Sequence, residues 1–304
     1  EVEESNNCYD EILAIDPTNK FALNNKASNL VRIGFFKEAL ELANNALEVD
    51  PSFINAIGNK AHALKGLKKL DEALTFLNEK KELMDKSINL QLAKVDLCIE
   101  LLDLKEAYKI NEGILSKNPD YIDAINNKGV IFEKNSKFQK RDKYLGLSMK
   151  CFEQIIEKDN KYPLGWSNKA VVLLNSNQVE DAEKVIDTAY SLFPKNPHVL
   201  NKKGVILRVK MKPKEAIKYF NRALRLRFEE EFLLNRARVQ LELNHFKEAT
   251  KDAETLLKYN PKKSEAWRVK GLALKNLRQS TKAAICFKKA KEYEEKPISL
   301  LESD

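Results

Sequence analysis

The chain has 304 residues, of which 43% are hydrophobic and 32% charged, with only 9 Gly and 9 Pro. This composition indicates a folded, helix-rich protein, and no apolar run approaches the roughly 20 residues that cross a bilayer. Its net charge of +8 is uneven, because residues 1–193 hold 26 Lys and Arg against 31 Asp and Glu, while residues 194–304 hold 27 against 14. The two parts therefore carry −5 and +13, which predicts an acidic end and a basic end.

A basic residue recurs along the chain at a nearly constant spacing. The successive intervals are 34, 34, 34, 41, 34, 33 and 34 residues, and the eight members are Lys26, Lys60, Lys94, Lys128, Lys169, Lys203, Arg236 and Lys270. Such a period predicts a repeat architecture of eight units. Residues 1–17 hold Tyr9, Ile12 and Asp16-Pro17 in the register of the second half of a unit. We therefore expect a partial repeat there, consisting of its second helix alone.

Within each unit, apolar residues recur every three or four positions, which predicts two helices. A turn between them is expected near Gly34, Asn177 and Asn244, which tolerate left-handed backbone. Proline ends the second helix, because it cannot continue one. The dipeptides concerned are Asp16-Pro17, Asp50-Pro51, Asn118-Pro119, Phe193-Pro194 and Asn260-Pro261.

The fourth unit, at about 122–162, is seven residues longer than the others. An insertion within 139–145 restores the register, after which Ser148, Phe152 and Ile155 take the equivalent places. It either lengthens the hairpin or adds a loop, and it serves either as a tolerated surface insertion or as a lateral contact with a partner. A C-terminal tail is expected at about 296–304.

The repeat resembles the tetratricopeptide repeat in its 34-residue period, its Asp/Asn-Pro terminator and the paired alanines of its second helix. These alanines are seven apart, as in Ala39/Ala46 and Ala216/Ala223, and Trp166 and Trp267 occupy a place where the family favours an aromatic. The resemblance implies an all-α fold, with residues 18–304 forming one right-handed superhelical solenoid of eight helix-turn-helix repeats. It also implies that the first helix of each repeat, helix A, lines a concave groove.

Asparagine precedes the basic residue in five of the eight units. These residues are Asn25, Asn59, Asn127, Asn168 and Asn235. A carboxamide matches the donor and acceptor of a peptide bond, so a row of them can hold the backbone of an extended chain. The row resembles the asparagine ladder of O-linked N-acetylglucosamine transferases. Alternatively, each amide bonds a neighbouring helix or faces water. Lys202, Arg238 and Arg268 are expected to offer charge to acidic side chains of a bound peptide.

The recurring basic residue itself favours a structural interpretation. Its stem can lie over the packed helices while its charge pairs with a surface acid. The acids twelve residues later are the expected partners, namely Glu38, Glu72, Glu106, Asp181, Glu215 and Glu248.

We therefore expect a cytoplasmic, non-enzymatic scaffold that binds an extended segment of a partner protein, without metal or cofactor. His62, His198 and His245 lie in different units, and the four cysteines are too scattered to suggest a metal site. The carboxylate clamp of tetratricopeptide co-chaperones is not expected, because no unit has lysine at its first position. Two alternatives stay open: self-association of the acidic and basic ends, and binding of RNA or other nucleic acid by the basic C-terminal half. The basic residues for the latter are Lys202, Lys203, Arg208, Lys210, Lys212, Lys214, Lys218, Arg222, Arg225 and Arg227.

Overall fold

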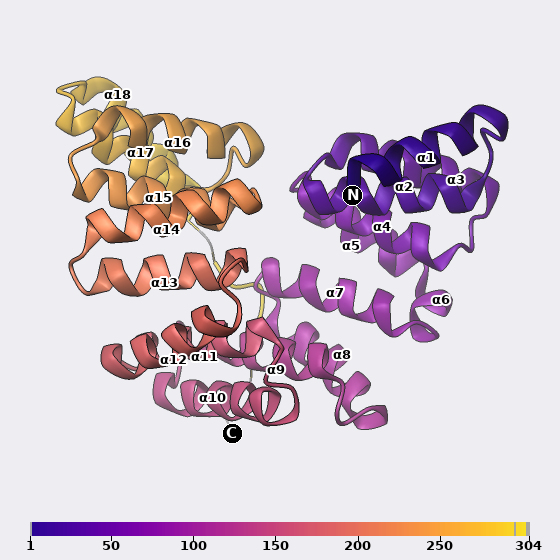
Figure 1. Cartoon of the computed structure of the whole chain (residues 1–304), viewed down its shortest axis with the longest axis horizontal. Coiled ribbons are helices and arrows are strands. Elements are labelled where there is room, and N and C mark those ends of the chain that lie inside the picture. Colours follow the sequence, from indigo (N-terminus) through magenta and orange to yellow (C-terminus); the bar gives the residue numbers. More distant parts are fainter. Residues whose placement is uncertain (1, 295, 302–304) are drawn as a thin grey trace. The chain divides into compact units, whose positions relative to one another are not determined.

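A computed structural model describes residues 2–294 and 296–301, and in this part of the chain it contains eighteen α-helices and no strand beyond one isolated bridge (Figure 1). The helices A are α2 (Lys20–Ile33), α4 (Ile54–Gly66), α7 (Ile88–Glu100), α9 (Ile122–Asn135), α11 (Pro163–Asn175), α13 (Pro197–Val209), α15 (Glu230–Glu242) and α17 (Ser264–Asn276). The helices B are α1 (Val2–Ile15), α3 (Phe36–Val49), α5 (Leu70–Glu79) with α6 (Lys81–Asp85), α8 (Leu104–Lys117), α10 (Arg141–Lys158), α12 (Val179–Leu192), α14 (Pro213–Leu226), α16 (Phe246–Tyr259) and α18 (Ser280–Glu292). The predicted all-α class of stacked helical hairpins is confirmed.

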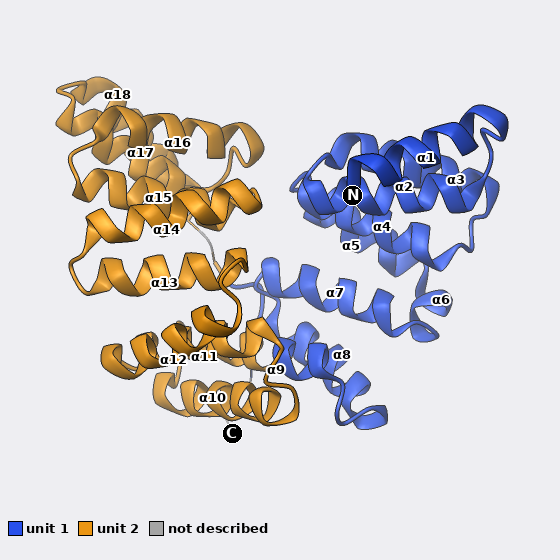
Figure 2. Ribbon diagram, in the orientation of Figure 1, with its two compact units in different colours: residues 1–127, 297–302, 304 blue, residues 128–296, 303 orange. Residues whose placement is uncertain are grey.

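The chain divides into two compact units (Figure 2). Among the described residues, unit 1 takes those from 2 to 127 and from 297 to 301, and unit 2 takes those from 128 to 296. Of the tail expected at 296–304, residues 302–304 lie outside the described residues. Within each unit, a helix packs against the next one along the chain, and neighbouring helices A also touch, as α13, α15 and α17 do. The helices A thereby form a continuous face in each unit.

The turn inside seven of the eight repeats contains one residue with positive φ, always eight positions after the basic residue. These residues are Gly34, Lys68, Leu102, Asn177, Met211, Asn244 and Arg278, with φ between 57° and 88°. The three predicted turns are confirmed. At the other four positions an ordinary side chain adopts the left-handed conformation, which costs about 1 kcal/mol each.

The insertion in the fourth repeat lengthens both the turn and helix B. Arg141, the first residue of α10, follows Lys128 by thirteen residues, whereas Leu104 at the start of α8 follows Lys94 by ten. Helix α10 has 18 residues, whereas α8 has 14. Three of the seven extra residues therefore enter the turn, and four add about one helical turn. The expected register is confirmed by the burial of Ser148, Phe152 and Ile155.

Helix B of the second repeat breaks at Lys80, between α5 and α6. Other repeats place a small, buried residue at the equivalent position: Ala46, Ala189, Ala223 and Ala290. A lysine ammonium is too costly to bury in such a packed position. The chain instead turns at Lys80, with φ −99° and ψ 29°, and its Nζ donates to the carbonyl of Pro51 at 3.3 Å.

Small residues after the basic position let helices A and B approach closely. A Cβ added to Gly204 would lie 2.7 Å from Cε1 of Phe220, and one added to Gly271 would lie 2.7 Å from Cε1 of Phe287. The equivalent Ala27, Ala170 and Ala237 are fully buried. The size of this residue therefore limits how closely the two helices of a repeat can pack.

The recurring basic residues brace the stack, but most of the predicted partners were wrong. Only Lys94 pairs with the acid twelve residues later, Glu106, at 3.5 Å. Four others pair with an acid sixteen residues earlier: Lys26–Asp10, Lys169–Glu153, Lys203–Asp187 and Lys270–Glu254. These acids lie on the preceding helix B, so the pairs connect successive repeats. Arg236 instead binds both carboxylate oxygens of Asp252, on the following helix B, at 2.8 Å each.

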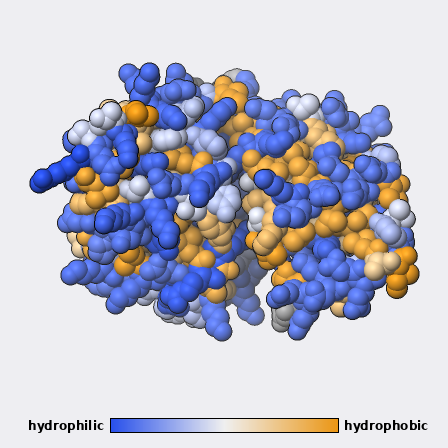
Figure 3. Space-filling view, turned by 90° about the horizontal axis from the view of Figure 1, so that it is seen from above, coloured by the Kyte–Doolittle hydropathy of each residue, from blue (hydrophilic) through white to orange (hydrophobic). Residues whose placement is uncertain are grey.

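Unit 1 leaves several large apolar side chains exposed, and broad apolar surface is visible over this unit in Figure 3. The residues are Ile12, Ile15, Phe21, Ile33, Phe35 and Val49. Helix α1 contains no buried residue among those described. Crossing a bilayer requires a long apolar helix, and no described helix meets that requirement.

Candidate functional site

The asparagines of unit 1 take part in hydrogen bonds between helices A. Asn59 on α4 donates through Nδ2 to the carbonyl of Asn24 at 3.1 Å and to its Oδ1 at 2.8 Å. Asn24, on α2, in turn donates to Oδ1 of Asn25 at 3.1 Å. Asn25 is exposed, whereas Asn59 and Asn127 are half-buried. The residue just before the predicted position, Asn24, is therefore the partner that joins two repeats.

Unit 2 contains the same arrangement. Asn235 on α15 is 5% exposed and donates to Oδ1 of Asn201, on α13, at 3.1 Å. Asn201 is fully buried and donates to Oε1 of Glu231 at 3.2 Å. Asn168 is half-buried on α11. Asn235 and Asn59 thus each use one amide hydrogen on a neighbouring repeat, and each carboxamide has a second N–H donor.

Lys202 lies beside this amide relay. Its Nζ is 2.5 Å from Oε1 of Glu231, the carboxylate that also accepts from Asn201. The charge of Lys202, with the hydrogen bonds from Lys202 and Asn201, lowers the pKa of Glu231 to about 2. Lys202 therefore already has an acidic partner within the fold.

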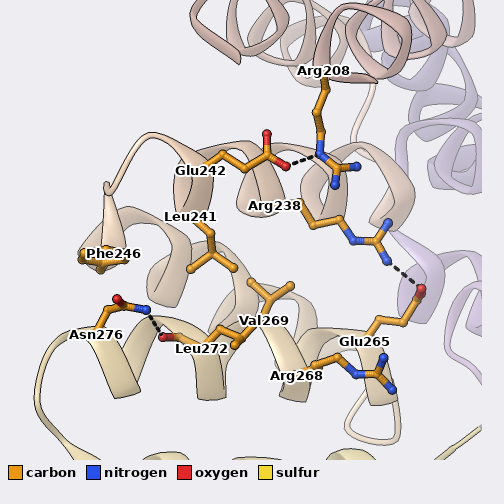
Figure 4. A pocket seen from close by; sticks show the side chains of 10 residues that line it. All are labelled: Arg208, Arg238, Leu241, Glu242, Phe246, Glu265, Arg268, Val269, Leu272 and Asn276. Carbon is orange, nitrogen blue, oxygen red and sulfur yellow. Dashed lines mark hydrogen bonds and ion pairs between the residues drawn. The ribbon is translucent and has the colours of Figure 1, made fainter. Parts of the chain in front are cut away.

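A cavity of about 440 Å³ opens on the helix A face of unit 2 (Figure 4). Its lining comes from α13, α15 and α17, together with the start of α16. The apolar lining residues are Leu241, Phe246, Val269 and Leu272. Leu272 is 41% exposed, so this apolar surface is accessible to a ligand. Both its size and its mostly apolar character suit a single bulky side chain of a bound partner.

Three arginines surround the cavity, one from each helix A. Arg208, Arg238 and Arg268 are spaced 30 residues apart, four fewer than the repeat. Each arginine therefore lies about one helical turn earlier on its helix than the one before. The three positions form a diagonal across α13, α15 and α17, as Figure 4 shows.

Two of these arginines are neutralised by ion pairs. Arg208 Nε lies 2.6 Å from Oε1 of Glu242, and an Arg238 terminal nitrogen lies 2.6 Å from Oε1 of Glu265 (Figure 4). Arg268 is exposed, and no acidic partner faces it among the described residues. The cavity therefore combines an apolar floor with one uncompensated positive charge.

The structure brings together only part of the predicted binding set. Arg238 and Arg268 line one cavity, whereas Lys202 lies with Glu231 in the amide relay. The prediction omitted Arg208 and all of the apolar lining residues. Their 30-residue arginine spacing was visible in the sequence, but it is offset from the 34-residue period that organised the alignment. In the part of the chain described, no group of three or more His, Cys, Asp or Glu side chains could hold a metal ion.

The family model for the tetratricopeptide repeat matches residues 168–227 and 234–297, and no curated protein matches the chain by sequence. A solved tetratricopeptide repeat protein from Parabacteroides merdae ATCC 43184 is 15% identical, with a TM-score of 0.58 over 84% of this chain and 98% of that one. The human IFIT1 dimer with m7Gppp-AAAA is 15% identical, with a TM-score of 0.65 over 96% of this chain and 68% of that one. The APC/C hetero-tetramer Cut9–Hcn1 is 16% identical, with a TM-score of 0.60 over 93% and 58%.

At these identities the solved structures show the fold alone. The resemblance of the asparagines to the ladder of O-linked N-acetylglucosamine transferases stays a prediction. The 34-residue period, the stacked helix A and helix B pairs, the family model and the solved repeat proteins all agree, and the chain belongs to the tetratricopeptide repeat family.

Proposed function

We propose that the chain is a non-enzymatic scaffold that binds an extended segment of a partner protein on its helix A faces. The cavity at Arg268 carries this proposal, because it joins accessible apolar surface to a cation with no acidic partner facing it among the described residues. A partner segment with a bulky apolar side chain beside a carboxylate complements both features. Burial of the apolar group supplies affinity, and the arginine adds orientation and specificity.

The predicted asparagines take different roles in this proposal. Asn25 in unit 1 is exposed and offers its carboxamide to the backbone of a bound segment. Asn59 and Asn235 each use one donor inside the fold, so they contact a ligand only through the other groups of the amide. Asn127 and Asn168 are half-buried and are proposed as weaker contacts of the same kind.

The charged residues also differ in what they can offer. Arg268 is the primary contact for an acidic side chain. Arg238 contributes after its pair with Glu265 rearranges, and Lys202 after its pair with Glu231 does. Breaking either pair costs part of the binding energy, because the glutamate then loses its counter-charge. We therefore expect Arg268 to dominate the electrostatic part of binding.

The test is a binding measurement with a pool of labelled, disordered peptides that differ in acidic and apolar content. Arg268→Ala and Leu272→Ala should each weaken the best acidic, apolar peptide about tenfold, which is the effect of roughly 1.4 kcal/mol at a binding hot spot. Lys282→Ala, an exposed lysine on α18, is the matched control for loss of one positive charge. If all three variants bind every peptide as the unchanged chain does, this cavity is not the binding site.

The basic outer surface of unit 2 supports a second candidate, which is binding of RNA. Exposed lysines lie four residues apart on two successive helices B, and the two pairs are 33 residues apart: Lys214 and Lys218 on α14, and Lys247 and Lys251 on α16. Such columns can follow a phosphate backbone. Random RNA that binds tightly at low salt and is lost steeply as salt rises would favour this candidate over the peptide scaffold.

Two further expectations belong to the same proposal. The four cysteines are free thiols, which suits a reducing, cytoplasmic location. The opposite charges of residues 1–193 and 194–304 also favour self-association at low salt. Sedimentation velocity at low and moderate salt separates that behaviour from binding to a partner.

A further inference from the structure

The turn between α7 and α8 in unit 1 holds an extended segment of the chain, residues 297–301. The backbone N–H groups of Ile298 and Ser299 both donate to the carbonyl of Leu102, at 3.1 and 3.3 Å. Leu104 N–H donates to the carbonyl of Ser299 at 2.9 Å, which completes a parallel bridge between Asp103 and Ser299. The segment is therefore held mainly through its backbone, in the manner of an added β-strand.

The Ser299 side chain adds a second set of contacts, at the start of α8. Its Oγ accepts from the backbone N–H of Lys105 at 3.3 Å and donates to Oδ1 of Asp103. The first N–H groups of a helix have no partner within the helix itself. Ser299 thus supplies partners for the first two of them, at Leu104 and Lys105, while Asp103 accepts from Glu106 N–H at 3.4 Å.

This turn differs from the other turns of the described repeats. Leu102 occupies the left-handed position and is only 8% exposed, whereas Met211 at the equivalent place is 86% exposed. Asp103 is an acid at the cap of helix B, where the other repeats with the same turn have Phe35, Lys69, Gln178, Lys212, His245 and Gln279. Leu301, two residues beyond Ser299, is 9% exposed. The sequence of this turn is thus adapted to a covering segment.

We propose that the α7–α8 turn is a docking site for extended peptide segments, and that residues 297–301 occupy it as an internal ligand. The site recognises a hydroxyl side chain at the position of Ser299 and an apolar side chain two residues later. While the tail is bound, it excludes other segments of the same kind. Release of the tail opens the site to such a segment from another molecule.

The experiment uses the full chain with Ile298→Pro and Ser299→Pro together, which removes both backbone donors and the hydroxyl while leaving all eighteen helices unchanged. The probe is a labelled nine-residue peptide with the sequence of residues 296–304, KPISLLESD. A short tether gives an effective concentration of about 1 mM, so the titration extends to that concentration. The control peptide carries proline in place of Ser299, and Asp103→Ala in the released chain removes the side-chain acceptor.

We expect the native-sequence peptide to saturate the released chain with one peptide bound, and the unchanged chain to bind at least about tenfold more weakly, because its own tail competes. The control peptide should not bind, and Asp103→Ala should weaken binding several-fold. Absence of saturable binding to the released chain would overturn the proposal, since the contact would then depend on the covalent tether.

Amide hydrogen exchange gives an independent readout that needs no peptide. The Leu104 and Lys105 amides should exchange about tenfold faster in the released chain than in the unchanged chain. The equivalent amides of Phe246 and Lys247, at the start of α16, have no tail contact in the structure and should keep their rates. Equal exchange at Leu104 in both chains would show that the tail does not occupy the turn, and would overturn the proposal regardless of the titration.

Discussion

Nδ2 of Asn235 donates a hydrogen bond to Oδ1 of Asn201 at 3.1 Å, which joins helix A of one repeat to helix A of the one before it. In unit 1, Asn59 and Asn24 make the same contact at 2.8 Å. A recurring asparagine in this family member is thus partly a device for holding repeats in register. Its contribution to folding can be separated from any contribution to binding, because Asn25 is exposed while Asn201 is buried.

Replacement of Asn201 by alanine should destabilise unit 2 by about 1–3 kcal/mol. The substitution leaves the buried amide of Asn235 without its acceptor and removes a donor from Glu231, and an unsatisfied buried polar group costs energy in that range. Urea unfolding followed by circular dichroism measures the change. Asn25→Ala is the control and should change stability by less than about 0.5 kcal/mol. Equal effects of the two substitutions would contradict a structural role for the relay.

Gly204→Ala should destabilise the chain by about 1–3 kcal/mol, because the new methyl group would meet the ring of Phe220 at 2.7 Å. The matched control is Gly113→Ala in α8, where nothing lies within 4 Å of the added Cβ. That substitution should stabilise its helix by roughly 0.5–1 kcal/mol, as alanine does relative to glycine in a helix interior. Thermal unfolding of both variants should therefore shift in opposite directions, and a shift in the same direction would refute the packing argument.

The sequence was sufficient to predict the repeat architecture, because the same physical requirement recurs in every unit. The small residue after each basic position must fit under helix B, so it repeats with the period of the stack, as Gly204 and Ala237 illustrate. The turn was predicted at Gly34, Asn177 and Asn244 from residue preference alone. Lys68 and Arg278 adopt the same backbone without that preference, since the surrounding helices fix the turn.

The cavity and the ion pairs were harder to predict, because they depend on how neighbouring repeats face one another. A search within one repeat suggested acids twelve residues after each basic residue, but Lys203 reaches Asp187 on the preceding helix B. Arg208 and Arg268 meet the same cavity through a 30-residue offset, which no single-repeat alignment contains. The contact between Ser299 and the turn at Asp103 joins parts of the chain that share no periodic relation at all.

Met211→Asn should stabilise unit 2 by about 0.5–1 kcal/mol. Met211 has φ 58° and is 86% exposed, so its side chain gains little from packing while it adopts a left-handed conformation. Asparagine tolerates that conformation and occupies the equivalent turn position at 177 and 244. Thermal unfolding checks the gain, and Lys214→Asn, placed on the ordinary helical backbone of α14, should give none. A loss of stability in Met211→Asn would show that backbone strain at this turn is negligible.

Thiol chemistry should distinguish one cysteine from the other three. Cys8 is exposed, while Cys98, Cys151 and Cys286 are buried. Burial also raises the pKa of Cys98 to about 12, which keeps it protonated and unreactive at neutral pH. Titration with a disulfide reagent should therefore find one fast thiol in the native chain and four after denaturation. Cys8→Ser should abolish the fast phase, and a second fast thiol in that variant would contradict the packing described.

The stability of unit 2 should fall as the pH drops from 6.5 to 4, in part because of His198. Burial lowers the pKa of this histidine to about 4, with help from the positive charges of Arg227 and Lys202. Between these two values the unfolded chain binds a proton that the folded chain excludes, so folding loses up to about 3 kcal/mol over this range. The lowered pKa of Glu231 acts at lower pH, between 4.5 and about 2.

Urea titrations of the unchanged chain and of His198→Gln at pH 7, 6, 5 and about 4.5 measure this dependence. Buried His62 also has a lowered pKa and contributes to both proteins, so only the difference between them reports on His198. The variant should lose less stability than the unchanged chain over this range. Parallel curves would mean that His198 titrates alike in the folded and unfolded chains, and that its environment beside Phe232 does not exclude the proton.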